Sequence, residues 1–138
     1  MRSMSEMSIL QRLEFLTMKA RQAVDRTSHI TSHHDFLCSP DNMDLFDATV
    51  LRIQVVGEML KQIDDLTNGE LLTPYYPQIP WRAVFGMRNV ISHEYAMVDP
   101  DKIYNTLKTD LPELLLVLDN IIADFRSGTH DNNLYNRL

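Results

Sequence analysis

The sequence predicts an all-α fold, an antiparallel bundle of four or five helices. Three observations support this prediction. Only four glycines occur in 138 residues, strand-like alternation of apolar and polar residues is absent, and apolar residues recur three or four positions apart. The length suits one compact domain. We expect that domain over residues 1–127, followed by a polar C-terminal tail over residues 128–138.

The first helix is expected from about Ser8 to Arg26. Its apolar residues recur at spacings of three and four and therefore share one face: Ile9, Leu13, Leu16, Ala20 and Ala23. A second helix is expected to begin after Ser39 as the N-cap, with Pro40 in its first turn, and to run to about Leu66. Its broad apolar arc indicates a central helix that packs on several neighbours or on another subunit.

Two further helical regions follow a connection marked by Asn68 and three prolines. The first begins near Trp81 and carries the segment of most interest. The last begins near Asp99 and ends near Ser127. We expect a kink or restart at Pro112, because proline cannot donate a hydrogen bond to the preceding turn.

The formal net charge of -6 argues against a protein that coats nucleic acid by bulk charge. The charge is uneven, since residues 35–70 hold two basic and eight acidic residues and residues 99–124 hold two and six. Residues 2–26 hold five basic and three acidic residues, and residues 71–98 hold two and one. Two mildly positive segments inside an acidic protein leave room for a local anion site.

Two features of the sequence indicate the cellular location: the single cysteine and the absence of long apolar runs. Cys38 has no partner for an intramolecular disulfide, which points to a reducing compartment such as the cytoplasm. No apolar run approaches the roughly 18 residues of a membrane span, and the first ten residues lack a secretory h-region. We therefore expect a cytoplasmic protein without a membrane segment.

A histidine-rich stretch is the first candidate for chemistry. His29 and His33 are four positions apart, as are His34 and Cys38, so each pair can share a helical face. A metal site also requires further ligands, and the Glu-x-x-His repeat of di-iron bundles is absent. We expect a surface helix end here, with no metal and no cofactor. A metal-binding bundle is the alternative, which elemental analysis would test.

A stronger signal lies in residues 81–95, WRAVFGMRNVISHEY. Four residues separate Arg88 from His93, and Tyr95 follows two positions later. Asn89 lies four positions before His93, so on a helix its amide can orient the imidazole. Arg88 and His93 would lie about 140° apart on a straight helix. They therefore converge only if the helix ends before His93 or if another chain completes the groove.

With this spacing of Arg88, His93 and Tyr95, the sequence resembles the HepT-like branch of the HEPN superfamily. The hallmark of that branch is Arg, four residues, His, one residue and Tyr, and it is matched without departure. A polar residue commonly follows the Arg, and Asn89 fits. The likeness covers roughly residues 9–125, and its other matching segments are Val56–Glu58, Ile79–Arg82 and Gly86–Asn89.

The resemblance implies a HEPN-like toxin whose antitoxin is a minimal nucleotidyltransferase. The toxin is expected to be a metal-independent ribonuclease that cuts transfer or messenger RNA, active as a homodimer with motifs from both subunits lining one cleft. Such cleavage needs groups that move protons and a cation that offsets phosphoryl charge. On this resemblance His93 transfers protons, Arg88 binds phosphate and Asn89 holds His93. Tyr95 matches the position where the antitoxin adds AMP, which would place a phosphate beside the site.

Each assignment has a structural alternative. His93 can be a satisfied histidine at a helix end, and Arg88 can form an ion pair within its helix or with a neighbouring one. Tyr95 can be a half-buried packing residue. Arg82 and Arg52 are second-tier candidates for RNA binding, although Arg52 can instead pair with a carboxylate. The whole chain can also be a non-catalytic partner that presents a nucleotide or substrate to the nucleotidyltransferase.

Overall fold

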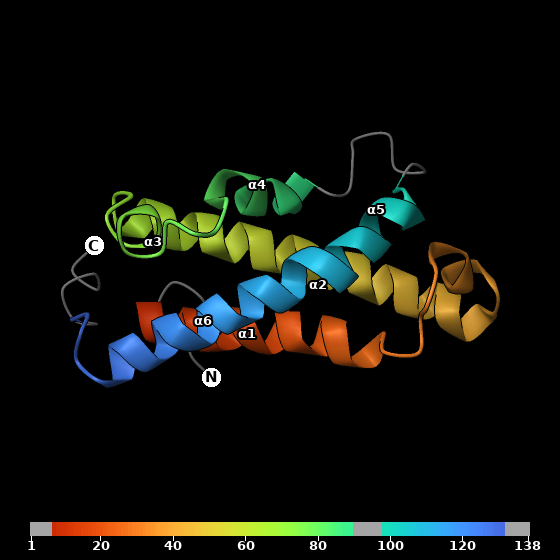
Figure 1. The fold of residues 1–138 in the computed structure, drawn as a ribbon, viewed down its shortest axis with the longest axis horizontal. Helices are drawn as coiled ribbons and strands as arrows, with labels where there is room; N and C mark the ends of the chain where they lie inside the picture. The colour runs from red at the N-terminus through yellow and green to blue at the C-terminus, as the bar shows by residue number, and fades with distance from the viewer. Residues whose placement is uncertain (1–6, 90–97, 132–138) are drawn as a thin grey trace.

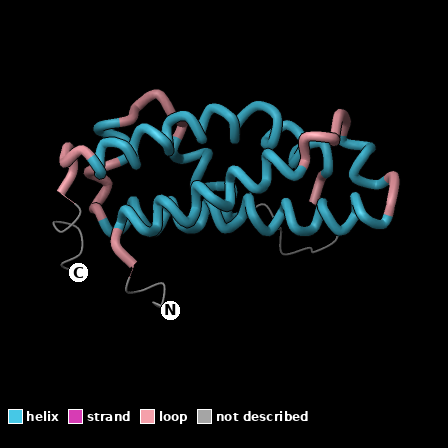
Figure 2. The backbone as a smooth tube through the Cα atoms, turned by 90° about the horizontal axis from the view of Figure 1, so that it is seen from below, coloured by secondary structure: helices cyan, strands magenta, loops and turns pink. Residues whose placement is uncertain are grey.

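The computed structural model describes residues 7–89 and 98–131, and these residues form helices and loops without a strand (Figure 2). Three long helices dominate: α1 (Ile9–Arg26), α2 (Pro40–Leu66) and α6 (Leu111–Arg126). α1 packs against both α2 and α6 and runs antiparallel to them (Figure 1). The predicted all-α, antiparallel bundle is confirmed. No helix in the described part of the chain is both long and apolar enough to cross a membrane.

The two long N-terminal helices begin where the sequence predicts, and each start is capped by a serine. Ser8 Oγ accepts a hydrogen bond from the Gln11 amide at 3.1 Å, and the Gln11 side chain accepts one from the Ser8 amide at 2.9 Å. This reciprocal pair satisfies two amides that lack intrahelical partners. Ser39 Oγ accepts from the Asn42 amide at 3.1 Å, with Pro40 in the first turn of α2. Both predicted helix starts are confirmed.

The hydrophobic core lies between the apolar faces of the three long helices. Burying one Leu or Ile side chain stabilises the fold by about 1.5–3 kcal/mol, so these faces supply most of the driving force. The fully buried members from the long helices are Leu13, Leu16, Ala20, Ala23, Val56, Leu60, Ile63, Leu111, Leu118 and Ile121. Periodicity predicts the α1 members of this set, because the apolar stripe of α1 faces α2 and α6.

Shorter elements fill the connections between the long helices. They are η2 (His33–Leu37), α3 (Leu72–Tyr75), α4 (Trp81–Phe85), η3 (Gly86–Asn89), α5 (Pro100–Asn105) and η4 (Thr106–Asp110). α4 and η3 pack on α2, and η2 lies between α2 and α5. The π-helical turn η4 joins α5 to α6 immediately before Pro112, which confirms the predicted interruption. The one-turn helix α3 lies within the connection that the sequence marks only as a loop.

The chain beyond α6 is folded back on the bundle as far as Asp131. The Thr129 amide donates to the Asp124 carbonyl oxygen at 2.9 Å, and His130 is 6% exposed. The His130 ring lies against Tyr75 and Phe125. A polar, poorly held tail was expected from residue 128, yet this histidine is buried. The domain boundary at residue 127 stays a prediction, and residues 132–138 lie outside the described part.

Candidate active site on α2 and the turn after α4

The helix that leads into the motif is anchored at its first residue. Trp81 is buried, and its Nε1–H donates to the Tyr76 carbonyl oxygen at 2.8 Å. Its ring stacks on Phe85, with the ring centroids 6.3 Å apart. The α-helix expected to continue through Arg88 ends at Phe85 and tightens into the 3₁₀ turn η3 at Gly86.

Arg88 extends from η3 to the surface of α2. Its Nη1 lies 4.0 Å from Glu58 Oε2, and the two side chains are 40% and 49% exposed. An exposed pair at this separation contributes little to stability, because water screens it. The sequence allowed Arg88 a partner within its helix or on a neighbouring helix, and the described partner is on a neighbouring helix. The sequence marks Glu58 only as part of the matching segment Val56–Glu58, and the packing of η3 on α2 is what brings it beside Arg88.

The remaining motif residues are described only in part. Asn89 is the last residue of η3 and is exposed. His93 and Tyr95 fall in residues 90–97, outside the described residues. The predicted contact between Asn89 and His93 is therefore not tested, and the roles assigned to His93, Tyr95 and Asn89 stay predictions.

A shallow apolar groove lies on α2 beside Glu58. Its volume is about 280 Å³, and its lining residues are Leu51, Gln54, Val55, Glu58, Met59 and Gln62. Leu51 is 58% exposed and adds apolar surface to this groove. Because Glu58 both lines the groove and faces Arg88, the groove and the start of the motif share an edge.

The two second-tier arginines differ in their surroundings. Arg82 is exposed on α4 and forms no ion pair with any described residue. Arg52 lies on α2 about 120° around the helix from Glu58, so it points away from Arg88. Its Nη1 is buried without a described hydrogen-bond partner. Burial lowers the pKa of Arg52, and the positive charge of Arg26 lowers it further. Roles for either arginine in RNA binding stay predictions.

The histidine-rich stretch does not gather into a ligand set. His29 Nε2 lies 3.1 Å from Asn42 Oδ1, and His33 Nδ1 lies 3.5 Å from an Asp101 carboxylate oxygen. Cys38 Sγ is 3.2 Å from the His34 carbonyl oxygen. Within residues 7–89 and 98–131, no three His, Cys, Asp or Glu side chains could together hold a metal ion. The described contacts instead join the loop before η2 to α2, and η2 itself to α5.

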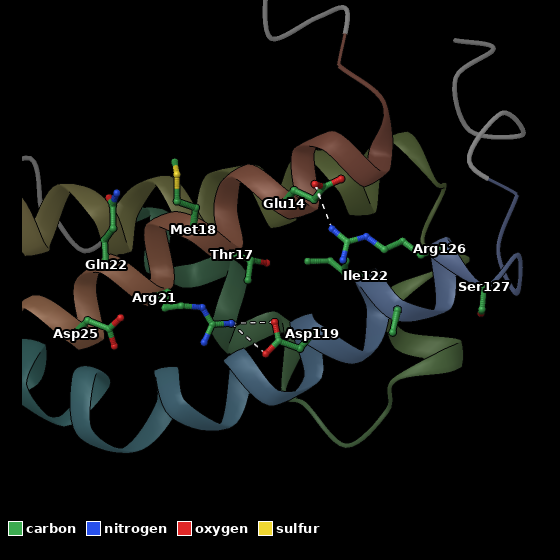
Figure 3. Close-up of a pocket in the computed structure, with 11 residues that line it drawn as sticks. Glu14, Thr17, Met18, Arg21, Gln22, Asp25, Asp119, Ile122, Arg126 and Ser127 are labelled. Atoms are coloured by element: carbon green, nitrogen blue, oxygen red, sulfur yellow. Dashed lines mark hydrogen bonds and ion pairs between the residues drawn. The ribbon is translucent and has the colours of Figure 1, made fainter.

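A wider cavity than the α2 groove lies elsewhere, between α1 and α6, with a volume of about 900 Å³ (Figure 3). Two ion pairs span it. Arg21 reaches both carboxylate oxygens of Asp119 at 2.9 and 3.0 Å, and Arg126 reaches Glu14 at 3.4 Å. Each guanidinium is neutralised by a carboxylate across the groove. Because Asp119 binds Arg21 through two short hydrogen bonds, whereas Glu58 lies 4.0 Å from Arg88, this cavity is a weaker anion site than the surroundings of Arg88.

The motif and its surroundings fall within a known protein family. A family model described as "Ribonuclease HepT-like" matches residues 17–121, which include Glu58 and the whole motif. The chain belongs to the ribonuclease HepT-like family. The probable ribonuclease HepT of Thermococcus cleftensis is 30% identical over 97 residues, which cover 70% of this chain and 80% of that protein.

Other relatives carry similar names. A candidate RNase of Methanocaldococcus jannaschii is 32% identical over 87 residues, which cover 63% of this chain and 67% of that protein. A candidate RNase of Caldanaerobacter subterraneus subsp. tengcongensis is 30% identical over 106 residues, covering 77% and 80%. No solved structure is a significant match. Membership of this family supports a ribonuclease activity for the chain.

Proposed function

We propose that the chain is a metal-independent ribonuclease toxin that acts in the cytoplasm and is silenced by a minimal nucleotidyltransferase antitoxin. The observation that carries the proposal is the position of Arg88. A member of a ribonuclease family presents this arginine on an exposed turn, beside one weakly paired carboxylate, five positions before His93. A guanidinium in this setting can exchange Glu58 for a phosphate, because Glu58 approaches it only to 4.0 Å whereas a phosphate can bind it through two hydrogen bonds.

The proposed reaction needs no group beyond those of the protein and the RNA. His93 takes the proton of the ribose 2′-OH, which attacks the adjacent phosphorus, and a second proton donor protonates the departing 5′-oxygen. Arg88 offsets the charge that builds on the phosphoryl oxygens. Asn89 holds the His93 ring in position. Arg82 lies six positions before Arg88, is exposed on α4 and extends the cationic surface toward the RNA strand.

The need for a second proton-transfer group supports a homodimer. One chain offers one motif histidine, whereas a two-fold dimer places two His93 and two Arg88 side chains around one cleft. The exposed apolar groove around Leu51 and Val55 lies beside Glu58 and would bury its surface against a second copy. This interface would bring the two motif segments to the same edge of the assembly.

Tyr95 is the proposed site of AMP addition by the antitoxin. The adduct would add a negative phosphate two positions after His93 in the motif segment, and would thereby exclude the RNA phosphate. Intact-mass measurement after co-expression with a minimal nucleotidyltransferase should show adenylyl adducts on the wild type and none on Tyr95→Phe. An adduct on the Phe variant would refute this site.

The test of the ribonuclease proposal is cleavage of single-stranded and transfer RNA by the purified chain in excess EDTA. We expect cleavage by the wild type and none by His93→Ala, with equal helicity by circular dichroism. Unchanged cleavage by His93→Ala would contradict the assignment. An intact RNA together with stable binding of the nucleotidyltransferase would favour the non-catalytic partner role.

A further inference from the structure

Gly57 lies in a buried position of α2 directly beneath the turn that carries Arg88. A Cβ placed on Gly57 would lie 2.5 Å from the Arg88 backbone nitrogen and 2.9 Å from the Met87 carbonyl carbon. It would also lie 3.0 Å from the Met87 Cβ. The two nearest atoms belong to the backbone, so no change of side-chain rotamer relieves the overlap. The turn η3 rests on the bare helix at this point.

The other three glycines of the chain serve different needs. Gly69 and Gly128 have φ angles of 71° and 86°, the left-handed region that favours glycine. Gly86 begins η3 with an ordinary φ of -63°, and an added Cβ there meets nothing within 4 Å. Gly57 is thus the glycine whose missing side chain is required by a close approach. Gly86, which lies in η3 itself, is a matched control for a glycine-to-alanine change.

Glycine in a helix interior is less favourable than alanine, because it loses more backbone freedom on folding. In α2 this less favourable residue lies between Val56, which is fully buried, and Glu58, which faces Arg88. The same stretch of helix therefore receives both the backbone of Arg88, at Gly57, and its guanidinium, at Glu58. Glycine at position 57 allows the turn that carries Arg88 to pack directly against the backbone of α2.

We propose that Gly57 is a positioning residue for Arg88. Because Gly57 has no side chain, the backbone of η3 can approach α2 closely. This close approach determines the position of the Arg88 guanidinium at the edge of the α2 groove. The inference rests on the proposed ribonuclease function for its catalytic consequence, whereas the seating of the turn is tested without RNA.

The test compares the wild type with Gly57→Ala and Gly86→Ala as full-length chains. In Gly57→Ala we expect unchanged helicity, backbone amide exchange of residues 86–89 that is at least tenfold faster, and a kcat for RNA cleavage that is at least tenfold lower. Gly86→Ala should match the wild type in all three. Equal exchange in Gly57→Ala and the wild type would overturn the proposal, as would a loss of helicity, because the overlap involves only the turn.

A double variant separates positioning of Arg88 from a general structural effect. If Gly57 acts through Arg88, adding Gly57→Ala to Arg88→Lys lowers kcat by less than twofold beyond Arg88→Lys alone. Multiplying effects, or faster exchange in Gly57→Ala with unchanged kcat, would overturn the positioning role. Absence of cleavage by the wild type would instead contradict the ribonuclease proposal, and amide exchange would still decide whether Gly57 seats the turn.

Discussion

Two polar clusters of the molecule differ in their burial and in the strength of their hydrogen bonds and ion pairs. At one end of the bundle, the Tyr76 hydroxyl donates to an Asp124 carboxylate oxygen at 2.6 Å and lies 2.8 Å from His130 Nε2. Because the single hydroxyl proton goes to Asp124, His130 Nε2–H is the donor in the second bond. Beside η3, Arg88 and Glu58 are exposed and 4.0 Å apart. We call the cluster of Tyr76, Asp124 and His130 closed, because its hydrogen bonds are satisfied within the chain, and the pair of Arg88 and Glu58 open.

This difference separates a structural cluster from a site that can take a ligand. Burial and the bond to Asp124 raise the pKa of Tyr76, so the phenol stays neutral and holds both partners. Breaking such a network leaves buried polar groups without partners, which costs about 1–3 kcal/mol per group. The Arg88–Glu58 pair has little to lose, since exposed pairs contribute at most about 1 kcal/mol. Changes in the closed cluster should therefore affect stability, and changes in the open one should affect function.

The largest expected effect is on catalysis at the open cluster. Arg88→Ala should lower kcat/KM for RNA cleavage by about 100- to 1000-fold, the usual cost of losing one group that stabilises transition-state charge. The free energy of unfolding should change by less than about 1 kcal/mol. Steady-state cleavage and urea denaturation measure the two quantities.

Arg21→Ala is the matched control for Arg88→Ala. This arginine is also exposed and paired with a carboxylate, but on the α1–α6 side (Figure 3). It should leave cleavage unchanged. Equal losses of cleavage in the two variants would show that general surface charge, and not the Arg88 site, is responsible.

The next effect is on assembly at the groove beside the open cluster. If a second copy covers Leu51, Leu51→Asp should raise the dimer dissociation constant by roughly 30-fold or more. Losing the burial of one leucine costs about 2 kcal/mol. Leu116→Asp is the control, because Leu116 is 69% exposed on α6, away from the groove. Sedimentation of both variants decides, and equal weakening of the dimer by both would contradict the assigned interface.

Local sequence signals predicted the helices well and the site only in part. The helix starts near Ser8 and Ser39 and the interruption at Pro112 are local features, and each is confirmed. The partner of Arg88 on α2 depends on tertiary packing, which periodicity does not report. The same holds for the burial of His130, because a polar residue near a chain end shows no sign of the aromatic rings that cover it.

The third effect is on stability at the closed cluster. Tyr76→Phe removes one hydroxyl and leaves Asp124 and His130 without that partner, so we expect unfolding to become easier by about 1–3 kcal/mol. Tyr75→Phe is the control, because Tyr75 is exposed and its ring contact with His130 is kept. RNA cleavage by folded Tyr76→Phe should match the wild type. A tenfold loss of kcat in this variant would contradict the assignment of the closed cluster to stability alone.

The smallest effect is the pH dependence of the closed cluster. Burial lowers the pKa of His130 below its ordinary value of 6.5, although Asp124 opposes this. The unfolded chain therefore takes up this proton before the folded chain does, and the free energy of unfolding falls as the pH drops below about 6.5. The slope for one proton is at most about 1.4 kcal/mol per pH unit. His130→Gln should flatten the urea-denaturation profile between pH 7 and 5, and an unchanged slope would refute this origin.

The central claim is that this chain cuts RNA through the 2′-OH with the groups of its motif segment. The most direct measurement is cleavage of one RNA strand and its fully 2′-deoxy analogue in EDTA by the wild type and His93→Ala. The account predicts that only the wild type cuts, and only the ribose strand. Equal cutting of the deoxy strand, or of the RNA by His93→Ala, would contradict it.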